Sequence, residues 1–148
     1  MHFFNYTYKI AIVFNLLGWG ALILFPSWAL LDQFILVIAG YGLCSIYTLS
    51  LLMGSKFDHQ PLQGHILTFS GVMKLMALPR MVLPSWIHFF SFDLIAGWYV
   101  VHNSQLYDIS HWMIIPCLIF GFMLGPLGLL LYLLLRVYVT GEFLLPFM

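Results

Sequence analysis

The chain is poor in charged residues. Only 7% of its 148 residues are Asp, Glu, Lys or Arg, against about 25% in soluble domains, and 63% are hydrophobic. A soluble fold of this length would need far more polar surface to cover its core. Five basic and five acidic residues balance, which leaves no electrostatic footprint for nucleic acid. The composition predicts an integral membrane protein whose apolar side chains face the lipid bilayer.

Cysteines and catalytic motifs are equally scarce. Cys44 and Cys117 lie inside apolar runs, where buried thiols behave as small hydrophobes, so we expect no disulfide framework. The sequence contains no nucleophile–base arrangement, phosphate loop or dinucleotide fingerprint. Four polar residues between the last two apolar runs have spacings that match no zinc signature: His102, Asn103, Asp108 and His111. We therefore expect a solvated loop there, no bound metal and no cofactor.

Four apolar runs organise the chain, over residues 10–31, 34–53, 85–101 and 112–139. A membrane-spanning helix needs about 20 mostly apolar residues. The runs therefore predict an all-α, polytopic membrane protein with four transmembrane helices in a single domain over residues 1–148. The fourth run exceeds the hydrocarbon thickness, so we expect it to tilt or to kink at Pro126.

The basic residues predict an orientation. Lys9, Lys56, Lys74, Arg80 and Arg136 fall on one side of a four-span topology or at its edge, whereas loops 32–33 and 102–111 carry no Lys or Arg. The positive-inside rule then places both termini in the cytoplasm.

The segment over residues 54–84 begins polar and becomes amphipathic. Ile66, Phe69, Met73 and Met76 supply the apolar positions. This pattern predicts a short amphipathic helix lying at the membrane interface, and a re-entrant helix lining a cavity is the alternative. Lys74 belongs to this stretch, and snorkelling to the interface is its simplest role.

Asp93 is the most informative residue, because it lies at the middle of the third run. A carboxylate there costs roughly 2.5 to 3.5 kcal/mol on insertion scales. An interhelical hydrogen bond contributes only about 0.6 kcal/mol, so a functional site is favoured over a structural link. His88 lies five residues earlier, about 140° away around a helix. The two side chains could flank one cavity without bonding each other directly.

Glycines and one asparagine complete the unusual residues of the apolar runs. Gly121 and Gly125 form a G-x-x-x-G pair, which indicates close helix packing within or between chains. A homo-oligomer through these glycines is one possibility. The break at 125–128 must have its backbone carbonyls satisfied by neighbours or exposed to a cavity. Asn15 in the first run can bond across helices.

Several of these features resemble the abscisic-acid-deficient-four-like family. The resemblance covers roughly residues 70–136 and rests on these residues: Gly71-Val-Met-Lys74, Trp86-Ile-His88, Asp93-Leu-Ile-Ala-Gly, His111, Pro116, Gly125-Pro-x-Gly128 and Arg136. Asn15, Trp19 and Pro26 are weakly similar as well. The order W-x-H-x4-D-L followed by G-P-x-G carries most of its specificity.

The resemblance implies a four-span plastid or bacterial membrane protein. Plant members act where violaxanthin becomes neoxanthin, an isomerisation that opens an epoxide to an allenic alcohol. Carried over to this chain, it makes His88, Asp93 and Lys74 candidate catalytic residues. A protonated carboxyl in a dry site could protonate the epoxide oxygen while a base removes a carbon-bound proton. Candidate residues for substrate binding are Asn15, Trp86, Trp98 and His111.

Two positions depart from the family pattern. Trp98 stands where the family often has Arg, and Asn103 stands where it often has an acidic residue. A paired loss of charge and counter-charge argues for a different substrate. The first apolar run starts at Ile10, which leaves no room for a transit peptide before it. We therefore expect a protein of the bacterial inner membrane rather than a plant enzyme.

Three functions stay open at this point. The leading one is an isomerase acting on a carotenoid-like or other lipid-soluble compound. A non-catalytic membrane scaffold or lipid-binding subunit would use the glycines for assembly. A small transporter module would use Asp93 as a proton or ion relay.

Overall fold

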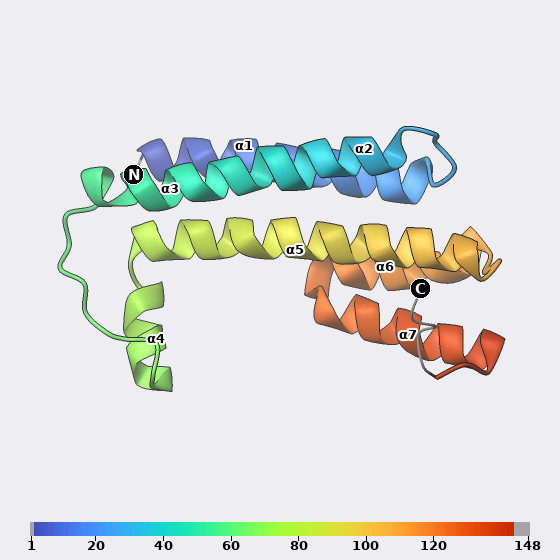
Figure 1. Ribbon diagram of the computed structural model, residues 1–148. Coiled ribbons are helices and arrows are strands. Elements are labelled where there is room, and N and C mark those ends of the chain that lie inside the picture. Colours follow the sequence, from blue (N-terminus) through green and yellow to red (C-terminus); the bar gives the residue numbers. More distant parts are fainter. Residues whose placement is uncertain (1, 144–148) are drawn as a thin grey trace. The chain divides into compact units, whose positions relative to one another are not determined.

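The computed structural model describes residues 2–143, and most of these residues lie in helices. The helices are α1 (His2–Leu24), α2 (Leu31–Ile35), the π-helix η1 (Leu36–Leu43), α3 (Cys44–Phe57), α4 (Phe69–Met76), α5 (Pro79–Leu106), α6 (His111–Leu124) and α7 (Pro126–Thr140) (Figure 1). No strand occurs among residues 2–143. The prediction of an all-α fold is confirmed.

Contacts between residues divide the chain into two compact units. The first unit combines the start of α1 with residues 36–91, and the second combines residues 17–35 with the chain from Phe92 onward. The first unit therefore contains η1, α3 and α4, and the second contains α2, α6 and α7. Residues of α1 and α5 contribute to both units.

Two helices are long and apolar enough to cross a membrane. They are α1, with 23 residues, and the continuous helix of 27 residues formed by α2, η1 and α3. α1 ends at Leu24 and not at residue 31, because Pro26 disfavours helical backbone in the residue before it. α5 extends beyond the predicted span 85–101 at both ends. These lengths confirm two candidate spans. The predicted topology of four spans is not confirmed.

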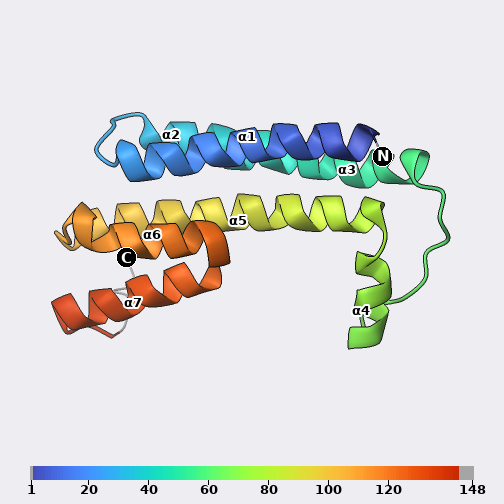
Figure 2. The same ribbon diagram turned by 180° about the vertical axis from the view of Figure 1, so that it is seen from behind.

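The fourth apolar run, expected as one helix over residues 112–139, is divided into α6 and α7. The break lies at Gly125, whose φ of 20° is unfavourable for residues with a Cβ, and Pro126 begins α7. α6 and α7 lie side by side in both views (Figures 1 and 2). A Cβ on Gly128 would collide with the backbone of Gly121 and the carbonyl oxygen of Cys117. The expected kink is therefore a helical hairpin with a glycine contact at its centre.

The hairpin changes where α7 ends within the second unit. Tyr132 of α7 bonds Asn103 near the end of α5, and the Arg136 guanidinium lies 5.3 Å from the ring centroid of Tyr107. The end of α7 therefore lies beside the 107–110 connection.

The π-helix η1 interrupts the second apolar helix within the first unit. π-turns are rare and leave the carbonyls of the wider turn open to other partners. Ser91 of α5, which is buried, donates to the carbonyl oxygen of Ala39 at 3.3 Å, and its Oγ lies 3.4 Å from Cys44 Sγ. Ser91 thus joins α5 to the distorted turn.

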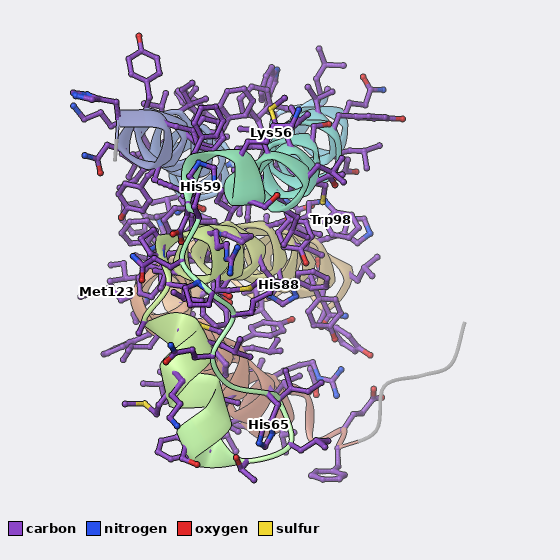
Figure 3. All side chains as sticks on the ribbon, turned by 90° about the vertical axis from the view of Figure 1, so that its left-hand side faces the viewer. Lys56, His59, His65, His88, Trp98 and Met123 are labelled. Atoms are coloured by element: carbon purple, nitrogen blue, oxygen red, sulfur yellow. The ribbon has the colours of Figure 1, made fainter. Side chains whose placement is uncertain are left out.

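The amphipathic segment forms the short helix α4, as predicted. Thr68 caps it by accepting from the Gly71 amide at 3.2 Å. The side chains of Phe69, Met73 and Met76 are exposed at helical spacing. Figure 3 shows Lys56 at the end of α3, with His59 and His65 along the linker that leads to α4.

Arg80 fastens this linker to the start of α5. Its Nη2 donates to the carbonyl oxygen of Gln60 at 2.6 Å, and its Nη1 donates to that of Asp58 at 3.3 Å. The Asp58 side chain in turn accepts from the Gln60 amide at 3.2 Å. Arg80 is therefore a structural anchor in addition to a candidate charge for orientation.

Candidate functional site

The first unit contains a pocket beside His88 with a volume of about 370 Å³. Ligand pockets typically hold about 300–1,000 Å³ and are mostly apolar with a few polar groups. Its lining comes from α3, α4 and α5, and consists of Tyr47, Leu51, Met76, Met81, Pro84, Ser85, His88 and Phe89. His88 is its one histidine, and Tyr47 and Ser85 supply hydroxyls.

Helical spacing brings these groups to one wall. Met81, Ser85 and His88 recur along α5 at intervals of four and three residues, which places them on one face. Pro84 removes one backbone donor from this turn, and the Ser85 hydroxyl donates to the Met81 carbonyl oxygen at 2.8 Å. The rings of His88 and Tyr47 have centroids 6.2 Å apart. Figure 3 marks His88 on α5.

Two other predicted site residues, Lys74 and Trp86, also lie in the first unit but outside this pocket. Lys74 is exposed on α4 and packs toward the linker, where a Cβ on Gly64 would be 3.0 Å from the Lys74 Cβ. Trp86 is exposed, and its ring meets those of Phe89 and Phe90 edge-on. The structure does not line the His88 pocket with either residue. Their catalytic and binding roles stay predictions.

Asp93 belongs to the second unit and lies against the hairpin turn. It is half-buried at the middle of α5, and a Cβ on Gly125 would be 2.6 Å from its carboxyl carbon. Gly125 is the residue before α7, where the first amides of a helix lack partners and favour negative charge. No side chain at Gly125 itself can cap the helix. The position of Asp93 therefore supports a structural role in the hairpin beside the predicted catalytic one.

The remaining predicted residues have separate environments. Trp98 donates from Nε1 to Asp32 Oδ1 at 2.7 Å, in a pocket of about 270 Å³ within the second unit. His111 donates from Nε2 to the Ile23 carbonyl oxygen at 2.9 Å and so ties the start of α6 to α1. Asn15 is buried in the first unit, and its Oδ1 has no hydrogen-bond partner among residues 2–143. Their predicted roles in binding stay untested.

A buried polar cluster in the second unit was missed by sequence reasoning. Arg136 is only 1% exposed, and Tyr132, one turn earlier on α7, is fully buried. Tyr132 donates to Asn103 Oδ1 at 2.6 Å. The Arg136 guanidinium lies over the Tyr107 ring, a cation–π contact worth roughly 0.5–2 kcal/mol. An arginine four residues after a tyrosine in an apolar run was the available signal, but Arg136 was interpreted as a charge for orientation and as part of the family resemblance, not as a buried residue.

Several donors of this cluster have no partner. Arg136 Nη2 donates to the carbonyl oxygens of Glu142 and Phe143, both at 3.3 Å. Its Nε and Nη1, and the hydroxyls of Tyr99 and Tyr107, are buried without a hydrogen-bond partner among the described residues. The Tyr99 ring meets that of Tyr132 edge-on at 6.4 Å. The cluster therefore combines a positive charge with unused donors.

The described part of the chain contains neither a cluster of metal-ligating side chains nor a disulfide. No group of three or more His, Cys, Asp or Glu side chains among residues 2–143 could hold a metal ion. Cys44 and Cys117 are free thiols.

These observations define a protein that is helical over its described residues. It has two long apolar helices, an apolar hairpin formed by α6 and α7, and large apolar side chains exposed on most of its helices. The ABA DEFICIENT 4-like family matches residues 6–132. Because that match covers most of the chain, the protein belongs to this family. No curated protein and no solved structure matches the chain.

Proposed function

We propose that the protein is a membrane protein that binds an apolar, carotenoid-like molecule in the His88 pocket and isomerises it by proton transfer. The observation that carries this proposal is the pocket itself, with one imidazole set in a lining of Leu, Met, Pro and aromatic side chains. The exposed apolar side chains and the family membership support the membrane location. The substrate class comes from the resemblance to the plant members linked to neoxanthin synthesis.

The chemistry requires one acid and one base. Opening an epoxide to an allenic alcohol transfers a proton to the ring oxygen while a proton leaves carbon, so no net proton is gained or lost. The imidazole of His88 can act as the acid or as the base, because each ring nitrogen can hold or accept a proton. The hydroxyls of Tyr47 and Ser85 are the other polar groups of the pocket that could orient a substrate oxygen.

A test begins with what the purified protein carries. The full chain is purified in a mild detergent, and the bound lipids and pigments are identified by mass spectrometry. We expect a polyene or epoxide bound in about equal amount to the protein. The protein is then supplied with an epoxide-bearing carotenoid in liposomes, and the products are separated by chromatography.

His88→Ala is the decisive variant for catalysis. Loss of a general acid–base group lowers the rate about 10²- to 10⁴-fold, while helicity and elution volume should stay unchanged. His59→Ala is the matched control, because His59 is an exposed histidine of the linker. Equal rates for His88→Ala and the unchanged protein would refute the assignment.

A non-catalytic lipid-binding protein is the second candidate. The exposed apolar positions of α4, at Phe69, Met73 and Met76, favour it, since they suit a helix lying at a lipid surface. This candidate predicts phospholipid as the only bound molecule and no conversion of any carotenoid. It also predicts that His88→Ala leaves the bound lipid unchanged.

A further inference from the structure

The second unit buries the positive charge of Arg136, and the described residues make few hydrogen bonds to it. Arg136 is 1% exposed, yet two of its three guanidinium nitrogens, Nε and Nη1, have no hydrogen-bond partner among residues 2–143. Burying a charge is unfavourable unless it is paired and hydrogen-bonded. The Glu142 and Phe143 carbonyl oxygens engage only Nη2. Within the described part of the chain, these two nitrogens are therefore available to a hydrogen-bond acceptor.

The neighbouring side chains add further hydrogen-bond donors. The Tyr99 and Tyr107 hydroxyls are buried and have no hydrogen-bond partner in the described part of the chain. The amide oxygen of Asn103 already accepts from Tyr132. A cluster of one cation and two unused hydroxyl donors suits an oxyanion, which accepts hydrogen bonds at every oxygen.

The position of this cluster along the helices indicates which oxyanion it would bind. Asn103 lies one turn before the end of α5, Tyr107 follows that end, and Arg136 lies one turn before the end of α7. If α5 crosses a membrane, the end of a helix of this length lies at the level of the lipid headgroups. Phosphate is the anionic group found there, and arginine suits its geometry.

We propose that Arg136, Tyr99 and Tyr107 form a binding site for a phosphate oxyanion, supplied by a phospholipid headgroup or by free phosphate. The site lies in the second unit and uses none of the residues of the His88 pocket. It therefore stands or falls independently of the proposed isomerase activity.

The test measures binding to the full chain in nonionic detergent by native mass spectrometry. Three probes are titrated: phosphatidylglycerol, diacylglycerol with the same acyl chains, and sodium phosphate. We expect phosphatidylglycerol to bind and diacylglycerol, which lacks the phosphate, to bind at least tenfold more weakly. Binding of sodium phosphate alone would identify the source as the free anion, and binding of the lipid alone would identify the headgroup.

Conservative variants separate the site from general lipid contact. Tyr99→Phe and Tyr107→Phe each remove one hydroxyl, and we expect each to weaken binding about tenfold. Arg136→Gln should weaken it about 100-fold or more. Tyr138→Phe is the matched control on α7, because Tyr138 is 86% exposed, and it should bind like the unchanged protein. His88→Ala should also leave binding unchanged.

The proposal is overturned if diacylglycerol binds as tightly as phosphatidylglycerol, or if neither phosphate-bearing probe binds. It is also overturned if both tyrosine variants bind like the Tyr138→Phe control. The tyrosine variants keep the test decisive even if Arg136→Gln fails to fold, because they change one oxygen atom and no charge.

Discussion

The contact between Asp93 and Gly125 can be tested by substituting both residues. In Gly125→Ala the new Cβ would lie 2.6 Å from the Asp93 carboxyl carbon and 2.8 Å from Oδ2. Overpacking of this kind costs about 1–3 kcal/mol, and a side chain in left-handed backbone adds about 1–2 kcal/mol. We therefore expect Gly125→Ala to lower the free energy of unfolding by about 2–5 kcal/mol.

Asp93→Ala removes the carboxyl that the new Cβ would strike. In the double variant the steric part of the penalty should disappear, and only the backbone part should remain. The two substitutions should therefore be coupled by about 1–3 kcal/mol. Unfolding free energies of the four proteins can be measured in mixtures of mild detergent and dodecyl sulfate, with helicity as the signal.

Gly20→Ala is the matched control, since nothing lies within 4 Å of a Cβ at that position in α1. It should be neutral or stabilise by up to about 1 kcal/mol through helix propensity. If the effects of Asp93→Ala and Gly125→Ala add within about 0.5 kcal/mol, Asp93 does not support the hairpin turn and the structural interpretation fails.

Three further substitutions have defined outcomes. Gly128→Leu should separate α6 from α7 and lower the free energy of unfolding by more than about 3 kcal/mol, measured in the same detergent assay; a smaller effect would contradict the close glycine contact. Arg80→Ala should release the linker carbonyls and speed proteolysis of residues 58–68 several-fold, whereas Lys74→Ala should not. Trp98→Phe should cost about 1 kcal/mol through the lost hydrogen bond, while the 81% exposed Trp112 should tolerate the same change.

The apolar runs located the helices because burial in lipid or in a core requires the same composition over a helical length. They could not distinguish a kink from a hairpin at Gly125. Both sides of the break are apolar, and the difference between a kink and a hairpin depends on the contact between Gly121 and Gly128, which are seven residues apart in the sequence. A sequence pattern shows that small residues are present, but only the tertiary structure shows that the two backbones approach each other closely.

Sequence reasoning selected one residue of the candidate sites, His88, and missed another, the buried Arg136, for a similar reason. His88 was selected because an ionisable side chain in an apolar run needs a polar or functional environment. In the structure it lines a pocket, and its catalytic role stays a prediction. Arg136 satisfies the same criterion, but counting it toward the orientation of the chain hid its burial. The positive-inside rule treats every basic residue near a helix end alike, and only the hairpin shows that this one faces inward.

With Arg136 buried, the remaining basic residues give a clearer prediction of topology. Lys9, Lys56, Lys74 and Arg80 all precede or begin α5. α5 has 28 residues and is about 42 Å long, so its length exceeds the hydrocarbon core of about 30 Å, although it is not one of the two helices that are also apolar enough to cross it. α6 and α7, with 14 and 15 residues, are about 21 and 22 Å long and fall short of it.

These lengths fit a re-entrant hairpin that enters and leaves the membrane on one side, next to the end of α5. Three crossings and a hairpin would place the N-terminal end of α1 in the cytoplasm and the end of α7 across the membrane, whereas four crossings place both in the cytoplasm. A green fluorescent protein fused after Thr140 should stay dark, because it does not mature when it is exported unfolded, and alkaline phosphatase fused there should be active. The same reporters inserted after Gln63 should give the opposite result, and a fluorescent fusion after Thr140 would show that α7 ends in the cytoplasm and that the hairpin does not return.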